Sequence, residues 1–308
     1  MDTASTTTTS TGGAADLSSV TTRVPAAINP YLVLTVAMLA VSCSAIFIKW
    51  STAPPLTIAA FRMGIATLCL APFVHAARRA QLRAIDLPTA GLIVLSGILL
   101  ALHFGFWTAS LEMTSVANSV LFVNVHPVLV AALAWPLFGE RTSRLGVLGI
   151  GLTLAGSTII AGGDLRLSGM ALRGDLLALL GAVVFAGYLL IGRGARQRLD
   201  VISYSVPVYA ICTLTLLGLS FPTGQSLLAV GGRDLLVFLA LALVCTLGGH
   251  LLYNWTLRYI TAAIVSTSFL AEPVIAALLA WLLLSQRLPV STLLGGVVVL
   301  GGIRLTAR

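Results

Sequence analysis

The chain of 308 residues is 58% hydrophobic and 9% charged, with a formal net charge of +8. A soluble globular domain carries about a quarter of its residues as charged side chains, which clothe its surface. This composition excludes a water-soluble fold and indicates an integral membrane protein.

Residues 1–28 form a Ser/Thr/Gly-rich stretch with little apolar surface to bury. We expect a disordered cytoplasmic tail, and no cleaved signal peptide, because no basic segment precedes an apolar core. Beyond it, ten apolar runs have the roughly 17–25 residues that a helix needs to cross a bilayer. These predicted spans are 31–49, 56–77, 87–110, 115–138, 145–162, 173–192, 203–221, 234–257, 262–284 and 290–306.

Basic residues indicate the orientation of the spans, because Lys and Arg in short loops remain in the cytoplasm. If both termini are cytoplasmic, most basic residues fall on that side, including the clusters Arg78, Arg79, Arg83 and Arg193, Arg196, Arg198. The sequence therefore predicts cytoplasmic termini. The same distribution explains the net positive charge, since a few basic residues per loop do not make a nucleic-acid surface.

Polar groups within the first predicted spans are rare, and each needs a reason because a charge at a helix centre costs roughly 2.5 kcal/mol or more. Arg62 lies near the start of a span, where snorkelling or structural pairing is the simplest interpretation and a substrate carboxylate the alternative. His103 and Trp107 are four residues apart and share a helix face, which suits an amphipathic substrate. An interhelical histidine beside an interfacial Trp explains the pair equally well.

Asn124 and His126 precede Pro127, which removes a backbone donor and can bend the helix. Freed carbonyls and polar side chains at membrane depth are the groups from which transporters build binding sites. We predict that these residues face a cavity. The alternative is a kink that is satisfied internally, with both side chains tying helices together.

The stretch around Pro127 recurs later in the chain. Residues 126–141, HPVLVAALAWPLFGER, and residues 272–287, EPVIAALLAWLLLSQR, are identical at eight of the fifteen positions after the first. The same offset of 146 residues pairs Gly149 with Gly295 and Gly156 with Gly302. We therefore predict two five-helix repeats, residues 29–162 and 173–308, joined by a linker over residues 163–172. Because five is odd, the second repeat crosses the membrane in the opposite sense.

The proline, the AL-AW-L run, GER at 139–141, SQR at 285–287 and the Gly-rich fifth and tenth spans resemble the EamA-type drug/metabolite transporter superfamily. The resemblance covers residues 31 to 306. It implies an all-α basket around a central cavity, walled mainly by spans 1, 3, 4, 6, 8 and 9, and export of amino acids or similar metabolites. The ten-span form is similar to aromatic amino acid exporters of the YddG type. Ser285 and Gln286 depart from GER, so no role of Glu140 carries over to them.

The second repeat holds the candidate for proton coupling, Glu272, because a carboxyl in an apolar environment can exchange a proton near neutral pH. Pro127 and Pro273 are the candidate gating positions. The simpler interpretation of Glu272 is a carboxyl near a span end that is solvated or paired with Arg62. Glu-Pro pairs are usual in the family that the chain resembles, whatever the substrate. Tyr188, Tyr253 and Asn254 are further candidates for substrate contacts, although packing is the commoner role of buried tyrosines.

Several classes of protein are excluded or disfavoured. Lys49 is the single lysine, so no G-x-x-x-x-G-K-[ST] motif for ATP exists, and the four cysteines have no C-x-x-C spacing for a metal. A membrane enzyme or sensor would need a catalytic constellation or a soluble output domain, and neither is visible. A sugar-phosphate or nucleotide-sugar exchanger would need several cations at mid-span, where Arg62 stands alone.

The sequence thus predicts a monomeric, ten-span, all-α secondary transporter of a bacterial inner membrane that is not an enzyme. Its partners are a small-molecule substrate and membrane lipid, with no cofactor, metal, ATP or nucleic acid. Amino acids, including aromatic ones, are the first expected substrates, exported by alternating access. Other metabolites or drugs are the alternative.

Overall fold

The computed structural model describes residues 26–161, 169–225, 227, 230–284 and 290–306, so the predicted tail and linker lie largely outside it. The described chain is helical, without β-strands. Its α-helices are α1 (Pro30–Ser42), α2 (Ser44–Trp50), α3 (Pro55–Leu70), α4 (Ala76–Arg83), α5 (Leu87–Met113), α6 (Val116–Val123), α7 (His126–Phe138), α8 (Arg144–Ala161), α9 (Gly169–Ala195), α10 (Val201–Ser220), α11 (Gly232–Ala240), α12 (Leu252–Thr256), α13 (Ala262–Ser268), α14 (Glu272–Leu284) and α15 (Val290–Thr306). Short 3₁₀ turns cover Ala71–Phe73 and Phe269–Ala271, and a π-helical stretch, Leu241–Leu251, joins α11 to α12.

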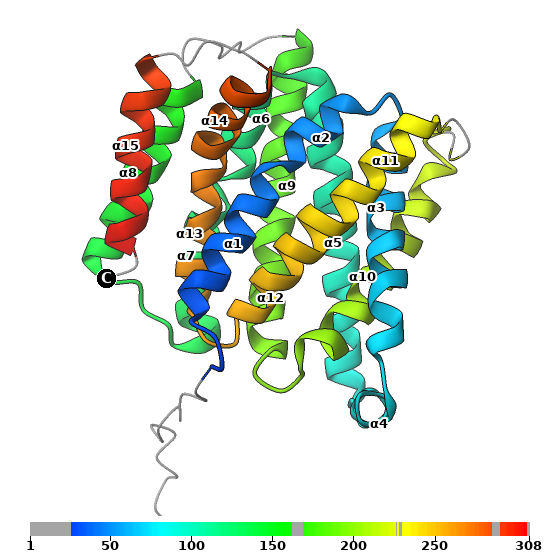
Figure 1. Ribbon diagram of the computed structural model, residues 1–308. Coiled ribbons are helices and arrows are strands. Elements are labelled where there is room, and N and C mark those ends of the chain that lie inside the picture. The colour runs from blue at the N-terminus through cyan, green and yellow to red at the C-terminus, as the bar shows by residue number, and fades with distance from the viewer. Residues whose placement is uncertain (1–25, 162–168, 226, 228–229, 285–289, 307–308) are drawn as a thin grey trace, which may run out of the picture.

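Seven helical segments in the described part of the chain are long and apolar enough to cross a membrane: Pro30–Trp50, Pro55–Phe73, Leu87–Met113, Asn118–Phe138, Gly169–Ala195, Val201–Ser220 and Gly232–Thr256. The other three predicted spans correspond to shorter apolar helices, Arg144–Ile160, Ala262–Ile275 and Val290–Thr306. Consecutive segments run in opposite directions, and α1 begins and α15 ends at the same end of the molecule, the lower end in Figure 1. The chain is a multi-pass membrane protein.

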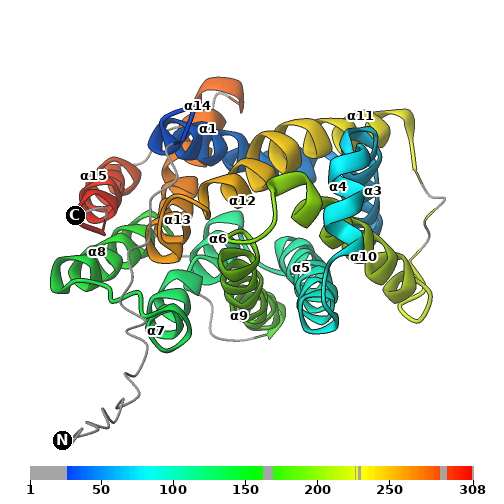
Figure 2. The same cartoon turned by 90° about the horizontal axis from the view of Figure 1, so that it is seen from below.

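The helices form two flanks around a central group. Figure 2 shows α8 and α15 at one side, α3 and α10 at the other, and α6, α9 and α12 between them. The α5 and α9 helices pack side by side, as do α8 and α15. The short basic helix α4 lies across the lower end (Figure 1).

Two helix breaks occur at corresponding positions of the repeated stretch. The α6 helix ends at Val123 and α7 begins at His126, and α13 and α14 are separated by the 3₁₀ turn before Glu272. Pro127 and Pro273 are each the second residue of the following helix, where a missing N–H costs no hydrogen bond. The kink expected at Pro127 is therefore a local interruption of the regular α-helix, and the second stretch has one as well.

The glycines of α8 and α15 bring the two backbones into contact. A Cβ atom on Gly149 would lie 2.6 Å from the carbonyl oxygen of Gly302, and one on Gly156 would lie 2.7 Å from that of Gly295. The reverse distances, from Gly302 and Gly295, are both 2.6 Å. Such distances leave no room for a side chain, so the small residues serve close packing within the chain.

Gly302→Ala is expected to destabilise the protein, although alanine is the better helix former. The new methyl group would overlap the α8 backbone, whereas a Cβ on the neighbouring Gly301 meets nothing within 4 Å. Gly301→Ala should therefore be neutral or stabilising by up to about 1 kcal/mol. The melting temperature in detergent measures both, and equal values for the two variants would contradict the close packing.

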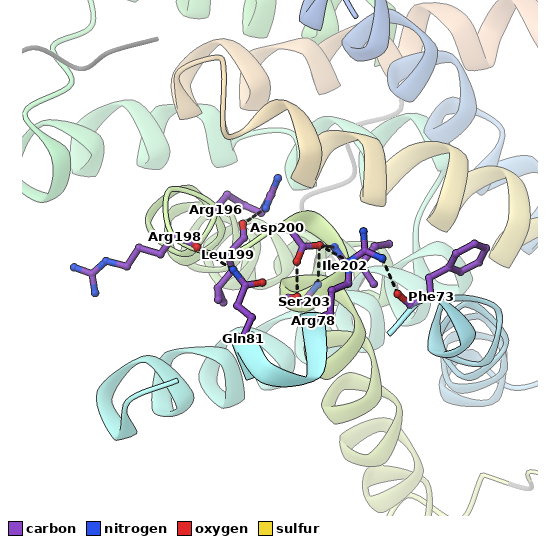
Figure 3. A network of polar contacts seen from close by, with 9 residues as sticks. All are labelled: Phe73, Arg78, Gln81, Arg196, Arg198, Leu199, Asp200, Ile202 and Ser203. Atoms are coloured by element: carbon purple, nitrogen blue, oxygen red, sulfur yellow. Dashed lines mark hydrogen bonds and ion pairs between the residues drawn. The ribbon is translucent and has the colours of Figure 1, made fainter. Parts of the chain in front are cut away.

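Asp200 joins several elements at the lower end (Figure 3). Its Oδ1 accepts from the Ile202 N–H at 3.0 Å, which caps α10, and pairs with Arg78 Nε at 3.0 Å. Ser203 Oγ donates to Oδ2, and Arg78 also donates to the Phe73 carbonyl at 2.6 Å. Burial acts to raise the pKa of Asp200, but the hydrogen bonds from Ser203, Ile202 and Arg78 outweigh it, so the pKa lies below its ordinary value.

Asp200→Ala is expected to lower the free energy of unfolding by about 1–2 kcal/mol, because it removes a helix cap that also holds α4. Asn29→Ala is a matched control, since the exposed Asn29 caps α1 through the Tyr31 N–H. Its loss should be smaller. Because the carboxylate form is the stabilising one, the difference between wild type and Asp200→Ala should shrink as the pH falls below about 4. A constant difference from pH 7 to pH 3 in thermal unfolding would contradict this role.

Candidate functional site

A small cavity lies beside the two helix breaks. Its lining residues are Val41, Ser44, His103, Trp107, Val123, Asn124, His126, Phe185, His250, Phe269 and Glu272. They come from α1 and α2, α5, α6 and α7, α9, the π-helical stretch, and the turn and helix at α14, which are the six spans that the resemblance implied. The cavity volume is about 20 Å³, room for about one water molecule. The helices are thus closed around this centre.

The wall of the central cavity is largely aromatic, and Phe185 is its hub. The Phe185 ring centroid lies 4.2 Å from that of His103, 4.9 Å from that of His126 and 5.2 Å from that of Phe269. The His103 ring is also nearly parallel to that of Trp107, at 6.2 Å and 7°. Stacked and edge-to-face rings of this kind favour an aromatic or flat apolar guest.

Four polar atoms of the cavity lining are buried without a partner in hydrogen-bonding geometry: Trp107 Nε1, Asn124 Nδ2, His126 Nε2 and Glu272 Oε1. The Asn124 amide lies beside the Glu272 carboxyl, and the His126 ring lies near the Ser266 carbonyl, but neither approach has that geometry. Buried donors and acceptors in folded proteins are nearly always paired. Their concentration around one cavity indicates a site for a ligand with polar groups.

Arg62 and Glu272 are both buried, at 1% and 5% exposure. Arg62 points inward from α3, so of the two simple interpretations structural pairing holds and snorkelling does not. Its Nε donates to Thr246 Oγ1 at 2.7 Å and its Nη1 to Ser44 Oγ at 3.0 Å. The guanidinium carbon lies 4.4 Å from the centroid of the Phe104 ring. Their two charges interact electrostatically, but the side chains do not approach each other closely enough to form an ion pair.

The predicted site residues fall into two layers. Those in the cavity wall are His103, Trp107, Asn124, His126 and Glu272. Behind the wall, Asn254 Nδ2 donates to Tyr188 Oη at 2.7 Å and to Ser205 Oγ at 3.3 Å. Tyr253 stacks on Phe269 with centroids 3.9 Å apart. The second layer supports the wall and does not line the cavity.

Some lining residues were not among the predicted site residues. His250 follows His103 by 147 residues, one more than the repeat offset, so the duplication could have identified it as a site residue. Phe185, Phe269 and Ser44 carry no such signal, because phenylalanine and serine are unremarkable in apolar helices. The alternative interpretation of His103 and Trp107 holds in part: His103 Nδ1 donates to the Gly181 carbonyl of the neighbouring α9 at 3.1 Å, whereas Trp107, at 5% exposure, is not an interfacial tryptophan.

A second hollow, of about 220 Å³, opens at the lower end and is lined by Glu140, Arg141, Thr142, Ser143, Thr261, Ala263, Ile264 and Thr306. Glu140 Oε1 accepts from Arg193 Nε at 2.6 Å, and Oε2 accepts from the Ala262 N–H at 3.3 Å. Arg193 also donates to the Leu257 carbonyl. We name the Glu140–Arg193–Ala262 contact the lower latch, because one carboxylate joins the segment after α7 to α9 and α13.

A different polar contact joins α11 to the turn between α2 and α3 at the upper end. Asp234 of α11 accepts from Ser51 Oγ at 2.7 Å and from the Thr52 N–H at 2.8 Å, both in the turn between α2 and α3. Beside it, Gln225 Oε1 accepts from the Leu56 N–H at 2.9 Å. We name the Asp234–Ser51–Thr52 contact the upper latch. The central cavity therefore lies between polar contacts at both ends.

A third hollow, of about 710 Å³, is a groove between α7 and α8. Its lining residues are Val128, Ala131, Ala132, Trp135, Arg141, Thr142, Val147, Ile150, Gly151 and Leu154. Trp135 is 56% exposed, and the groove lining includes a single buried polar atom without a partner, Thr142 Oγ1, among the described residues, against four around the central cavity. As a location for the substrate site, the groove has the larger volume, whereas the central cavity has the polar atoms and aromatic rings that a ligand needs. We place the site in the cavity, because an apolar outer groove of a membrane protein faces lipid tails.

Comparison with known proteins finds relatives that match along nearly the whole chain. The EamA-like transporter family matches residues 28–162 and again residues 172–308. An uncharacterized transporter of Archaeoglobus fulgidus is 23% identical over 282 residues, covering 90% of this chain and 96% of that protein. The uncharacterized transporter YyaM of Bacillus subtilis is 28% identical over 269 residues, covering 82% and 84%. A solved crystal structure with 21% identity shares the fold, with a TM-score of 0.73 over 90% of this chain and 95% of that one.

The family match and the relatives named as transporters show a membrane transporter of small molecules. The chain belongs to the EamA-like transporter family. This confirms the resemblance seen in the repeated stretch.

Proposed function

We propose that this protein is a secondary transporter that exports amino acids, including aromatic ones, across a bacterial inner membrane by alternating access. The observation that carries the proposal is the central cavity, where unpaired polar atoms and an aromatic wall meet. Polar atoms suit the charged end of an amino acid, and stacked rings suit a flat side chain. The transporter acts as a monomer in contact with lipid.

Alternating access requires the cavity to open to one side at a time. The lower and upper latches are polar contacts that can break and reform without unfolding a helix. The helix breaks before His126 and Glu272 supply joints next to the cavity. These features support ten spans in two inverted five-helix repeats, which rock about the cavity, with Pro127 and Pro273 at the joints.

The lower end is cytoplasmic in this proposal. Both the start of α1 and the end of α15 lie there, as does α4 (Figure 1). The latch residue Arg193 is in the last turn of α9, whose end is also there. The accumulation of arginine at this end supports the orientation through the positive-inside rule. Substrate then enters from the lower hollow beside Glu140 and leaves past Asp234.

The charges of the centre favour an amino acid over the alternatives. Among the described residues, the buried centre holds one guanidinium, Arg62, and one carboxyl, Glu272. A sugar phosphate needs several cations, and Glu272 would repel it. A hydrophobic cation is the second candidate, favoured by Glu272 and the aromatic wall and opposed by Arg62.

Uptake of radiolabelled phenylalanine by the purified protein in liposomes tests the proposed function. We expect saturable uptake that other aromatic amino acids compete for, with an empty-liposome control. A dependence on an imposed pH gradient that disappears in Glu272→Gln would make Glu272 the coupling residue. Saturable transport of a hydrophobic amine with no uptake of any amino acid would replace the proposal by its second candidate.

A further inference from the structure

Arg62 is held in place with one donor group left over. Its Nε and Nη1 are bound by Thr246 and Ser44, and its charge lies over the Phe104 ring, which together fix the guanidinium plane. Nη2 is buried and has no partner. Ser44 itself lines the central cavity, so the guanidinium lies directly behind the cavity wall. Burying a guanidinium without an anionic partner is costly, which calls for an explanation.

Glu272 has a buried acceptor without a partner, where Arg62 has a buried donor without one. Its side chain forms part of the cavity wall, and Oε1 is buried without a partner. The α14 helix, which begins with this residue, contacts α2, the helix of Ser44. A buried cation and a buried carboxyl therefore approach the same cavity, yet do not meet as an ion pair.

We propose that Arg62 and Glu272 are the two poles of a site for an α-amino-acid zwitterion, a refinement that rests on the proposed function. The substrate carboxylate binds Nη2 of Arg62, and the substrate ammonium group binds Oε1 of Glu272. The substrate side chain then lies against Phe185 and Trp107. A zwitterion is neutral overall and satisfies both buried charges at once, which neither an amine nor a carboxylic acid achieves.

The arrangement predicts discrimination by charge. An analogue that lacks one charge leaves either Arg62 or Glu272 buried and unpaired, and a site built to bind a polar group rejects ligands without it strongly. We expect phenethylamine and 3-phenylpropionate each to bind at least tenfold more weakly than phenylalanine. Both analogues keep the aromatic ring, so the difference reports on the two poles alone.

The experiment measures ligand-induced rises in melting temperature of the purified full-length protein in detergent. Three sets of probes are compared: zwitterions (phenylalanine, leucine, threonine), the amines that lack the carboxylate, and the acids that lack the ammonium group. In Arg62→Gln the preference for phenylalanine over phenethylamine should disappear, and in Glu272→Gln the preference over 3-phenylpropionate should disappear. Arg62→Lys, which keeps the charge, should retain part of the first preference. The exposed residues Arg173 and Glu112 supply the matched controls Arg173→Gln and Glu112→Gln, which should behave as wild type.

Two results would overturn the inference: an amine or an acid that stabilises the wild type as much as its zwitterion, or no stabilisation by any zwitterion. The wild-type comparison needs no variant, so it decides even if Arg62→Gln does not fold. The outcome is separable from the proposed function. Phenylalanine transport without charge discrimination removes the inference alone, and zwitterion binding without transport in liposomes removes the proposed function alone.

Discussion

Glu140→Gln is expected to open the lower end of the transporter. The Glu140 and Arg193 side chains are 15% and 18% exposed, so the pair is largely shielded from solvent. Removing one partner of such a pair costs about 3–5 kcal/mol when the pair is buried, because the other charge stays unpaired. Each 1.4 kcal/mol changes an equilibrium tenfold. Because the open lower end exposes Arg193 to water, the variant should shift towards that state by at least tenfold.

A cysteine between the lower latch and the cavity reports this shift. Ser266 is fully buried, one turn after the latch residue Ala262, and its carbonyl lies near the His126 ring. In a background without the four native cysteines, Ser266→Cys should be alkylated at least tenfold faster in Glu140→Gln by a membrane-impermeant reagent added at the lower end. The exposed Glu112→Gln is the control and should leave the rate unchanged. Faster alkylation from the upper end alone would show that the latch does not gate the lower side.

The membrane class and the family could be predicted from sequence because they depend on long-range regularities. The length of an apolar run predicts a membrane-spanning helix without knowledge of what packs against it. The repeat of residues 126–141 at 272–287 is recognisable in a chain of few residue types because it contains Pro, Trp and Arg. Of the two helix breaks, the one before Pro127 was predicted, and the second lies just before the matched Pro273. These signals need only the chain itself.

The position of Arg62 could not be predicted in this way. A charged residue near a span end can turn outward to the headgroups or inward, and the choice depends on partners far along the chain. Here Thr246, 184 residues away, accepts a hydrogen bond from the inward-pointing guanidinium, and the Phe104 ring packs against its face. The lower latch was missed for the same reason: Glu140 was recognised as part of a motif, but nothing in the sequence places Arg193 beside it.

Phe185→Ala is expected to change both stability and selectivity, because Phe185 is the hub of the cavity wall. It is 2% exposed and contacts the rings of His103, His126 and Phe269, so its removal leaves a hollow that these rings cannot all fill. Phe→Ala substitutions in packed cores cost about 3–5 kcal/mol. We expect a large drop in melting temperature in detergent. Phe221→Ala, at a position that is 78% exposed, is the control and should change little.

The two roles of Phe185, packing and substrate contact, separate in competition experiments. If its ring meets the substrate side chain, the enlarged cavity should admit larger side chains, and tryptophan should gain as a competitor relative to phenylalanine. Phe185→Leu keeps most of the apolar volume and should be much more stable than Phe185→Ala. Because leucine has no ring, it should still lack the stacking surface for the substrate. A stability loss with unchanged selectivity in both variants would assign Phe185 to packing and leave Trp107 and His103 as the substrate-facing rings, since they are the stacked pair that remains in the wall.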